Sequence, residues 1–368
     1  MNARPANLAR RPDNLRLAAD PPIRVLIVDD SSVARAVLSR MVGSQPGLEV
    51  VATAGCIADA VEVLRKVSLD VVLLDIEMPG GNGLDGLPDI IEAGRGARVL
   101  IVSSSADEGA ETAIRALSLG AADTMSKPVS GLFGGRFAEA LGERLRRIGR
   151  VGAIDRTASP SPEGRLKLRE VADWLPACIA IGASTGGIHA INDFVARLPR
   201  RTGLPIFLTQ HLPPLFMPFF ARQVAMSSGR RAHVVEANGP VTADEIHIAP
   251  GDAHLRLTRR GGKVRVRLDT TPAPSGCLPS VDPMLASVAE IYGRGGVAVM
   301  LSGMGRDGLI GSSTLVSSGG VVLAQDQASS AIWGMPRAVA EAGLATAVAR
   351  PGELARRIAV QLESGTWK

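Results

Sequence analysis

Short apolar runs alternate with segments of helical spacing along the first part of the chain. Five runs have the length and β-branched content of strands: Ile23–Val28, Glu49–Ala54, Val71–Leu74, Arg98–Ser104 and Ala122–Met125. Four segments have apolar positions at helical spacing: the one that starts after Ser31 or Ser32 with Val33, Val37 and Met41, then Ile57–Val67, Gly109–Leu119 and Arg136–Ile148. This alternation predicts βαβ units and a parallel sheet.

The same alternation starts again at residue 177. The predicted strands are Cys178–Ala183, Ile206–Gln210, His233–Val235, Glu245–Ala249, Lys263–Leu268, Val297–Leu301 and Gly320–Ala324. The predicted helices are Gly187–Leu198, Met217–Ser227, Met284–Ile291, Asp307–Ser317 and Met335–Glu341. We therefore predict two doubly wound α/β domains, the second with a β-hairpin or meander inserted at 233–268. The predicted divisions are a tail (1–22), a first domain (23–150), a linker rich in Pro, Ser and charge (151–174) and a second domain (175–368).

Composition indicates an ordinary globular protein, with 46% hydrophobic and 21% charged residues among 368. A net charge of +5 gives little support for nucleic-acid binding. The three cysteines are far apart and form no C-x-x-C pair, so we expect neither a disulfide framework nor a zinc site. The first 22 residues lack the apolar core of a signal peptide, and no apolar run approaches the roughly 20 residues of a membrane span. We expect a cytoplasmic protein without membrane insertion.

Three acidic residues, a serine and a lysine stand at the carboxyl ends of the first set of strands. They are Asp29, Asp30, Asp75, Ser103 and Lys127. Neighbouring carboxylates repel one another unless a divalent cation lies among them, and an oxygen-only ligand set suits Mg²⁺. Asp75, alone at the tip of an apolar strand, is the natural nucleophile toward a phosphoryl donor. Any one of these acids alone could be a solvated loop residue, but the full set favours a phosphate-accepting site.

This set resembles the receiver domain of two-component regulators over about residues 23–130. The resemblance implies a flavodoxin-like fold and phosphorylation of Asp75 by a sensor histidine kinase. It also implies a Mg²⁺ site made by Asp29, Asp30, Asp75 and the backbone carbonyl of Glu77. Ser103 and Lys127 would contact the phosphoryl oxygens. Receivers of this type usually carry an aromatic residue where this chain has Thr124, so the usual aromatic rotamer switch is not expected here.

A glycine-rich turn follows the first strand of the second domain, in the sequence Gly182-Ala183-Ser184-Thr185-Gly186-Gly187. Glycines around Ser184 permit a tight strand-to-helix turn and close approach of a substrate. The backbone N–H groups at the helix start, Thr185 first among them, could stabilise an oxyanion. The same turn is also typical of a dinucleotide cradle, which expects an acid at the end of the next strand. The next strand ends in His211 instead.

Ser184, His211 and Asp307 appear in that order, each just beyond a separate predicted strand. If these strands are neighbours, all three residues converge on one edge of the sheet, as a nucleophile, base and orienting acid require. Taken singly, each residue has a structural explanation; Asp307, for example, could simply cap a helix. The other four histidines have no matching partner and are expected to be structural or surface residues: His189, His233, His247 and His254.

Several blocks in the chain resemble the chemotaxis protein-glutamate methylesterases, the CheB family: IGASTGG, TQHLPP, IAPGDAHLRL, PSVDPML, LSGMGRDG and WGMPRAV. The resemblance implies that Ser184 is the nucleophile, His211 the general base and then acid, and Asp307 the residue that orients the imidazole. The backbone at Met304 is a second candidate oxyanion donor. Leu278 stands where the family commonly has an arginine, so a role of that arginine in docking or substrate contact is not expected here.

The resemblance implies a phosphorylation-activated hydrolase that demethylates glutamate methyl esters on chemoreceptors and deamidates glutamines. The hydrolase itself would need no cofactor. We expect the unphosphorylated receiver to cover the Ser184 cleft, so that removal of residues before about 174 changes the activity. Two other classes stay open on the residues alone. One is a nucleotide-binding enzyme that uses the glycine-rich turn, and the other is a response-regulator adaptor without catalysis.

Overall fold

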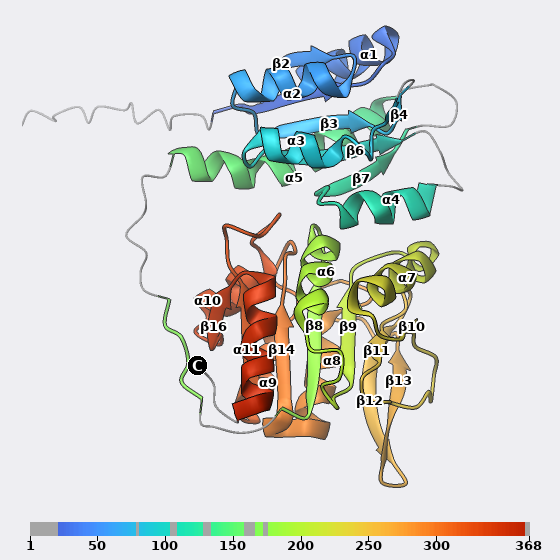
Figure 1. Ribbon diagram of the computed structural model, residues 1–368, viewed down its shortest axis with the longest axis vertical. Coiled ribbons are helices and arrows are strands. Elements are labelled where there is room, and N and C mark those ends of the chain that lie inside the picture. The colour runs from blue at the N-terminus through green and yellow to red at the C-terminus, as the bar shows by residue number, and fades with distance from the viewer. Residues whose placement is uncertain are drawn as a thin grey trace, which may run out of the picture.

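The chain folds into two α/β halves stacked along the long axis of the molecule (Figure 1). The computed structural model describes residues 21–78, 81–103, 109–127, 134–157, 166–171 and 176–364. Both halves are built on parallel sheets with helices on both faces. The predicted class of two doubly wound domains is confirmed.

The first half is a five-stranded parallel sheet with the order β2-β1-β3-β6-β7. Its strands are β1 (Ile23–Val28), β2 (Leu48–Ala54), β3 (Val71–Asp75), β6 (Arg98–Ser103) and β7 (Asp123–Ser126), and β4 (Glu77–Met78) and β5 (Gly81–Asn82) form a short separate pair. Its helices are α1 (Ser32–Gly43), α2 (Ile57–Lys66), α3 (Leu87–Gly94), α4 (Gly109–Ser118) and α5 (Gly135–Thr157). The strand order reverses at β1, so the ends of β1 and β3 meet at the switch point where such sheets bind ligands.

Three details of the first half differ from the sequence prediction. The buried stripe of α1 consists of Leu38 and Val42, whereas Val33 is 72% exposed, so the predicted apolar face was misplaced. Helix α3 was not predicted. Helix α5 continues to Thr157, past the predicted end at residue 148 and into the predicted linker. The domain boundaries themselves stay predictions.

The second half is a seven-stranded sheet with the order β10-β11-β9-β8-β14-β15-β16, and every pair in it is parallel. Its strands are β8 (Cys178–Ala183), β9 (Ile206–Gln210), β10 (Ala232–Val234), β11 (Ile246–Ile248), β14 (Gly296–Met300), β15 (Val321–Gln325) and β16 (Ala347–Ala349). Its helices are α6 (Gly187–Arg197), α7 (Met217–Ser228), α8 (Val281–Tyr292), α9 (Leu309–Ser317), α10 (Met335–Glu341) and α11 (Pro351–Ser364), with 3₁₀ turns η1 (Pro214–Phe216) and η2 (Gly293–Gly295). The strands are fully buried apolar runs, as a sheet covered on both faces requires.

The inserted hairpin consists of β12 (His254–Arg260) and β13 (Lys263–Asp269), which pair antiparallel. The prediction placed the insertion at 233–268, but its first part, β10 and β11, belongs to the main parallel sheet. Strand β12 was not predicted as a strand of its own, and strand β16 and helix α11 were not predicted at all. The apolar residues of β16 and α11 complete the edge of the sheet next to β15.

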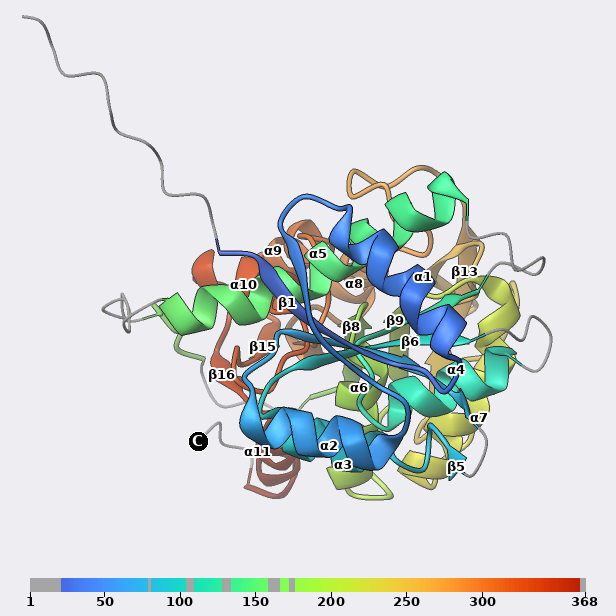
Figure 2. The same cartoon turned by 90° about the horizontal axis from the view of Figure 1, so that it is seen from above.

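The two halves meet through helix α4, which packs against α6, α7 and η1 (Figures 1 and 2). Apolar residues of α4 such as Ile114 and Leu117 belong to the same buried cluster as residues of the second sheet. Polar contacts surround this packing. The ring Nδ1 of His189 lies 3.0 Å from the Ser118 carbonyl oxygen, and the Arg98 guanidinium donates to the Ser330 carbonyl at 2.7 Å. Glu111 on α4 forms an ion pair with Arg222 on α7.

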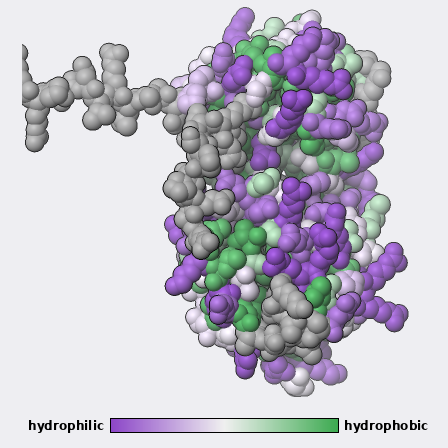
Figure 3. Space-filling view, turned by 60° about the vertical axis from the view of Figure 1, so that its left-hand side comes forward, coloured by the Kyte–Doolittle hydropathy of each residue, from purple (hydrophilic) through white to green (hydrophobic). Residues whose placement is uncertain are grey.

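On the face shown in Figure 3, hydrophilic side chains are interspersed with small hydrophobic areas over both halves, as is normal for globular domains. Among the described helices, none combines the length and apolar character needed to cross a membrane. Cys56, Cys178 and Cys277 all carry free thiols, as the cysteine spacing indicated.

Candidate functional site

Three neighbouring strands of the second sheet lead to the predicted catalytic residues. Strand β8 lies between β9 and β14. Ala183 at the end of β8 pairs with Gln210 at the end of β9, so Ser184 and His211 follow paired positions directly. Asp307 lies in the loop after β14. The sheet therefore brings the three predicted residues to one carboxyl edge, where α/β folds gather functional groups.

The turn after β8 is held in place by close backbone packing. The Ser184 N–H donates to the Ser302 carbonyl at 3.0 Å. Gly186 has a φ of 72°, a left-handed conformation that favours glycine, and a Cβ there would lie 2.2 Å from the Ala331 Cβ. A Cβ on Gly303 would lie 2.9 Å from the Ser184 Cβ. The glycines are therefore required for this turn to pack beside the loop after β14.

His211 and Asp307 form a buried hydrogen-bonded pair, with 2.8 Å between Nε2 and Oδ2. The Asp307 carboxylate is only 2% exposed and accepts two further bonds. The Ser280 hydroxyl donates to Oδ1 at 2.6 Å, and the Val281 N–H donates to Oδ2 at 2.7 Å. These donors hold the carboxylate in one orientation, so Asp307 can in turn orient the imidazole.

The same contacts set the protonation of both groups. Burial would raise the pKa of Asp307, but the bonds from His211, Ser280 and Val281 outweigh it and hold the pKa well below its usual range. Burial would lower the pKa of His211, but the hydrogen bonds with Asp307 and Cys277 outweigh it and raise the pKa to about 9. Asp307 is therefore ionised, and it stabilises the imidazolium that forms when His211 takes a proton.

Ser184 lies half-buried next to this pair. Its carbonyl accepts a bond of 2.8 Å from the Gln210 amide, which fixes the backbone of the turn. Within residues 176–364, no hydrogen bond is described between the Ser184 hydroxyl and His211. Catalytic bonds are often loose before substrate binds. The contact between serine and histidine therefore stays a prediction.

Two backbone N–H groups remain available beside Ser184. For this part of the chain, no hydrogen bond is described for the N–H of Thr185 or of Met304, the two predicted oxyanion donors. Thr185 lies in the turn between β8 and α6, directly before Gly186, the residue that caps this helix. Met304 follows Gly303 directly in the loop that packs against Ser184, and its side chain is 51% exposed. Both groups could donate to an oxygen bound next to the Ser184 side chain.

The sequence analysis missed the residues that support Asp307. His254 was expected to be structural, and its Nδ1 accepts a bond of 2.9 Å from the Ser280 N–H. The chain of contacts therefore runs from His254 through Ser280 to Asp307. The only signal in the sequence was the block PSVDPML, which contains Ser280 and Val281. Cys277, which nothing in its spacing singled out, also lies at the site, beside His211.

Carboxylates also gather at the switch point of the first sheet. The Lys127 ammonium donates to Asp29 Oδ2 at 2.9 Å and to Asp75 Oδ2 at 2.7 Å. Asp29 and Asp75 are buried and Asp30 is exposed, and oxygen atoms of these three acids lie within 4.8 Å of one another. The structure thus brings together four of the predicted residues. The Glu77 N–H also donates to Asp75 at 3.2 Å.

Burial and the contact with Lys127 shift the pKa values in this acidic cluster. Burial raises the pKa of Asp75 more than its bonds with Lys127 lower it. The carboxylates outweigh burial at Lys127 and raise the pKa of its ammonium group. The site offers three carboxylate oxygens as ligands, and the exposed Asp30 leaves it open to solvent, which fits the preference of Mg²⁺ for oxygen ligands. Ser103 ends β6, but its side chain lies outside the described residues.

The first domain contacts the second close to Ser184 and His211. His189, on the helix that follows Ser184, contacts the carbonyl of Ser118. The turn η1, three residues after His211, packs against α4. Ile332, whose carbonyl accepts the Gly303 N–H, is buried with the apolar core of the first domain. The first half therefore lies over the edge that carries the candidate catalytic residues.

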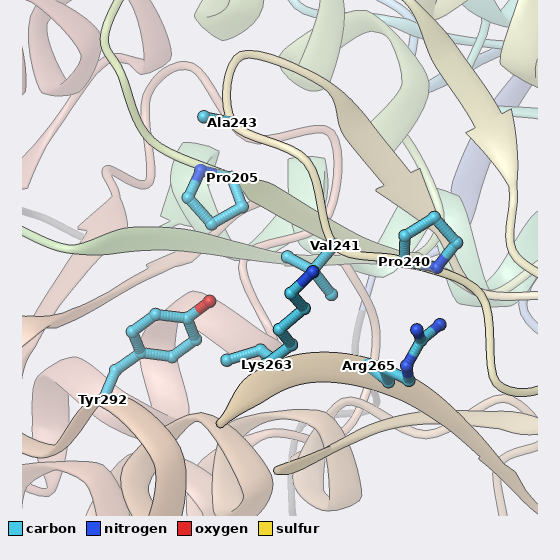
Figure 4. Close-up of a pocket in the computed structure, with 8 residues that line it drawn as sticks. Pro205, Pro240, Val241, Ala243, Lys263, Arg265 and Tyr292 are labelled. Atoms are coloured by element: carbon cyan, nitrogen blue, oxygen red, sulfur yellow. The ribbon is translucent and has the colours of Figure 1, made fainter. Parts of the chain in front are cut away.

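A cavity of about 340 Å³ lies elsewhere in the second domain (Figure 4). Its lining includes Pro205, Lys263 and Tyr292. Pro205 immediately precedes β9, whereas His211 immediately follows it. The cavity is therefore at the opposite end of the sheet from Ser184 and plays no part in the proposed chemistry.

Comparisons with known proteins agree with this architecture. The family model described as CheB methylesterase matches residues 179–358, and the response regulator receiver model matches residues 25–131. A protein-glutamate methylesterase/protein-glutamine glutaminase of group 2 operon from Bradyrhizobium diazoefficiens is 37% identical over 89% of this chain and 91% of that protein. A protein-glutamate methylesterase/protein-glutamine glutaminase 1 from Paramagnetospirillum magneticum is 38% identical over 92% of this chain and 95% of that protein.

Solved structures match each half separately. The crystal structure of the Thermotoga maritima CheB methylesterase catalytic domain is 34% identical, covers 51% of this chain and 98% of that chain, and has a TM-score of 0.49. The response regulator domain of Thermotoga maritima CheB is 41% identical, covers 34% of this chain and 94% of that chain, and has a TM-score of 0.31. On the full-length relatives, the chain belongs to the family of CheB protein-glutamate methylesterases that carry a receiver domain.

Proposed function

We propose that the protein is a protein-glutamate methylesterase that hydrolyses methyl esters of glutamate side chains on chemoreceptors and deamidates glutamines at such sites. The observation that carries this proposal is the buried hydrogen bond of 2.8 Å between His211 and Asp307. The two residues follow β9 and β14, the strands on either side of the one that leads to Ser184. An ionised acid, an imidazole and a serine at one sheet edge are the parts of an acyl-transfer centre. The named relatives act in the same reaction class.

In this mechanism, His211 takes the hydroxyl proton of Ser184 as the oxygen attacks the γ-carbonyl carbon of the ester. Asp307 stabilises the resulting imidazolium, and the N–H groups of Thr185 and Met304 donate to the oxyanion. The imidazolium then gives its proton to the leaving methoxide, so methanol departs and an acyl-enzyme remains. Water, deprotonated by His211, releases the glutamate carboxylate and restores Ser184. With glutamine, ammonia leaves in place of methanol.

We further propose that phosphorylation of Asp75 by a sensor histidine kinase activates the hydrolase in the cytoplasm. Asp29, Asp30, Asp75 and the Glu77 carbonyl would hold Mg²⁺, which neutralises charge at the phosphoryl group. Lys127 would leave its bond with the Asp75 carboxylate and contact the phosphoryl oxygens together with Ser103. Phosphorylation adds nearly two negative charges at the switch point and so would change the receiver surface that contacts α6 and α7.

The test is methanol release from methylated chemoreceptor membranes, with and without a small phosphodonor and Mg²⁺. We expect the phosphodonor to raise the rate of the wild-type protein. Ser184→Ala should lower the rate by about 10³-fold or more, because the remaining groups of a broken triad retain only weak catalysis. Asp75→Asn should keep basal turnover and lose the response to the phosphodonor. Wild-type turnover by Ser184→Ala would exclude this hydrolase assignment, and a stable complex without any turnover would indicate an adaptor.

A further inference from the structure

A thiol, an imidazole and a carboxylate meet at the edge of the second sheet. Cys277, His211 and Asp307 each offer one donor atom, and these three atoms lie within 4.8 Å of one another. They come from three separate loops, after β13, β9 and β14. The three residues are far apart in the sequence. For this reason the spacing of the cysteines alone predicted no zinc site.

We propose that Cys277, His211 and Asp307 form a binding site for Zn²⁺, and that binding of this ion stops the hydrolase. Zinc takes sulfur, nitrogen and oxygen donors in tetrahedral sites, and three protein ligands with one position left for water is a common arrangement. The inhibition rests on the proposed function of His211 as the base. The binding itself does not.

The geometry needs only small side-chain movements. Zinc bonds of about 2.0–2.3 Å at tetrahedral angles place neighbouring donors about 3.4–3.6 Å apart. His211 Nε2 and Asp307 Oδ2 are now 2.8 Å apart and would separate by about 0.6 Å. The Cys277 sulfur starts at most 4.8 Å from the other two donors. It lies in the loop between β13 and α8, where most neighbouring residues are exposed.

The surroundings also resemble the outer shell of a metal site. The second oxygen of Asp307 accepts the Ser280 hydroxyl at 2.6 Å, and Val281 donates to the first at 2.7 Å. Such outer contacts orient the ligand and are found around most protein metal sites. Cys277 is half-buried, and its neighbour Leu278 is 47% exposed, so an ion can reach the thiol from solvent.

The same chain offers a contrast that separates two kinds of cation. The receiver cluster of Asp29, Asp30 and Asp75 has oxygen donors alone, which suit Mg²⁺. The cluster at His211 includes sulfur and nitrogen, which favour Zn²⁺ over Mg²⁺. One protein would therefore take Mg²⁺ at its receiver and Zn²⁺ at its hydrolase. The first ion supports phosphorylation and the second blocks turnover.

Zinc would block catalysis because it takes the lone pair of His211 that the base needs to accept a proton. When His211 binds the ion through a ring nitrogen, and Asp307 binds through the oxygen that orients it, the imidazole cannot accept the Ser184 proton. The Cys277 thiol binds as a thiolate and releases its proton to solvent, so zinc affinity rises with pH. No oxidant or other reactant is needed, and removal of the ion by a chelator restores the enzyme.

The experiment uses the full-length protein and two readouts. Co²⁺ replaces Zn²⁺ as a visible probe, and a thiolate ligand gives it an intense near-ultraviolet charge-transfer band. We expect wild-type protein to show this band at one equivalent, and Cys277→Ser to lose it. In the methanol assay at buffered Zn²⁺ concentrations, each variant is compared with itself without metal. Cys277→Ser should need at least about tenfold more Zn²⁺ for half-inhibition, because loss of one ligand weakens such sites strongly.

Cys56→Ser is the matched control. Cys56 is exposed, lies in the receiver at the start of α2, and caps this helix through its sulfur, a role that serine can take. It should keep both the cobalt band and the zinc sensitivity. A band that persists in Cys277→Ser would overturn the proposal, because its thiolate would have to come from another cysteine. A zinc sensitivity equal to that of the wild type would overturn it as well. The cobalt band is measured without substrate, so it stands or fails separately from the methylesterase assignment.

Discussion

At the scale of single residues, Asp307 is the most constrained group of the candidate catalytic centre. Its two oxygens accept bonds from His211, Ser280 and Val281 at 2.6–2.8 Å. Charge-assisted bonds of this kind are about twice as strong as neutral ones. They place a full negative charge against one ring nitrogen of His211, so the other nitrogen is the one that can face a nucleophile. The pH dependence of the reaction should report this arrangement.

Asp307→Asn should lower kcat by about 10³–10⁴-fold, because the amide no longer stabilises the imidazolium or its correct tautomer. In the wild type, kcat/KM should rise with pH through the raised pKa of His211, about 9, since only the neutral imidazole accepts a proton. Without the Asp307 charge, the residual activity should titrate at lower pH. A pH profile of methanol release checks both. Asp269→Asn, in β13, is the control. An inflection that does not move in Asp307→Asn contradicts the pairing.

The residues that sequence reasoning found share a simple position. Asp75, His211 and Ser184 stand at or directly after strand ends, and the parallel sheet brings such ends together. Cys277 and His254 could not be found in this way. Cys277 lies in a loop whose path depends on packing after β13, and the role of His254 depends on a bond with a backbone N–H 26 residues away. Tertiary contacts of loops decide both, and no local pattern encodes them.

At the scale of elements, the longer strands and most helices were predicted, whereas helices α3 and α11 and strands β4, β5, β12 and β16 were not. β8 and β9 match their predicted bounds because continuous apolar runs are unambiguous. Helix α3 follows a stretch rich in glycine and proline, which hides the short apolar pattern behind loop signals. Helix α11 carried a readable signal, with proline at its first position and buried residues at Leu354, Ala355 and Ile358. Strand β16 has only three residues and depends on pairing with β15.

The packing of α11 can be tested by truncating one side chain on its buried face. Ile358 is fully buried in the cluster that joins α11 to the second sheet, and α11 packs against α6. Ile358→Ala should lower the free energy of unfolding by about 2–5 kcal/mol, because it removes buried methyl groups and leaves a cavity. Val360→Ala, on the same helix but 43% exposed, should cost well under half of that. Urea denaturation of both variants measures the difference. Equal losses would mean that α11 does not pack as described.

At the scale of the whole molecule, the sequence predicts two domains but not how they dock. The docking surface consists of α4 against α6, α7 and η1, and it joins residues that are far apart in sequence. Glu111 and Arg222, for example, are separated by 111 positions. A pattern of apolar residues predicts that α4 has a buried face, but not which helices cover it. The proposed regulation depends on this contact, because it lies beside Ser184 and His211.

The ion pair of Glu111 with Arg222 offers a way to loosen the docking without touching the catalytic edge. Both side chains are more than half exposed, and such pairs contribute at most about 1 kcal/mol. Arg222→Glu sets two carboxylates against each other and should raise methanol release by the unphosphorylated protein, by about fivefold at most. Adding Glu111→Arg should restore the low rate. Arg231→Glu, at an ion pair between the exposed Arg231 and the half-buried Glu245, should leave the basal rate unchanged. If Arg222→Glu leaves the basal rate unchanged while the phosphodonor still activates, this ion pair does not help to hold the receiver over the catalytic edge.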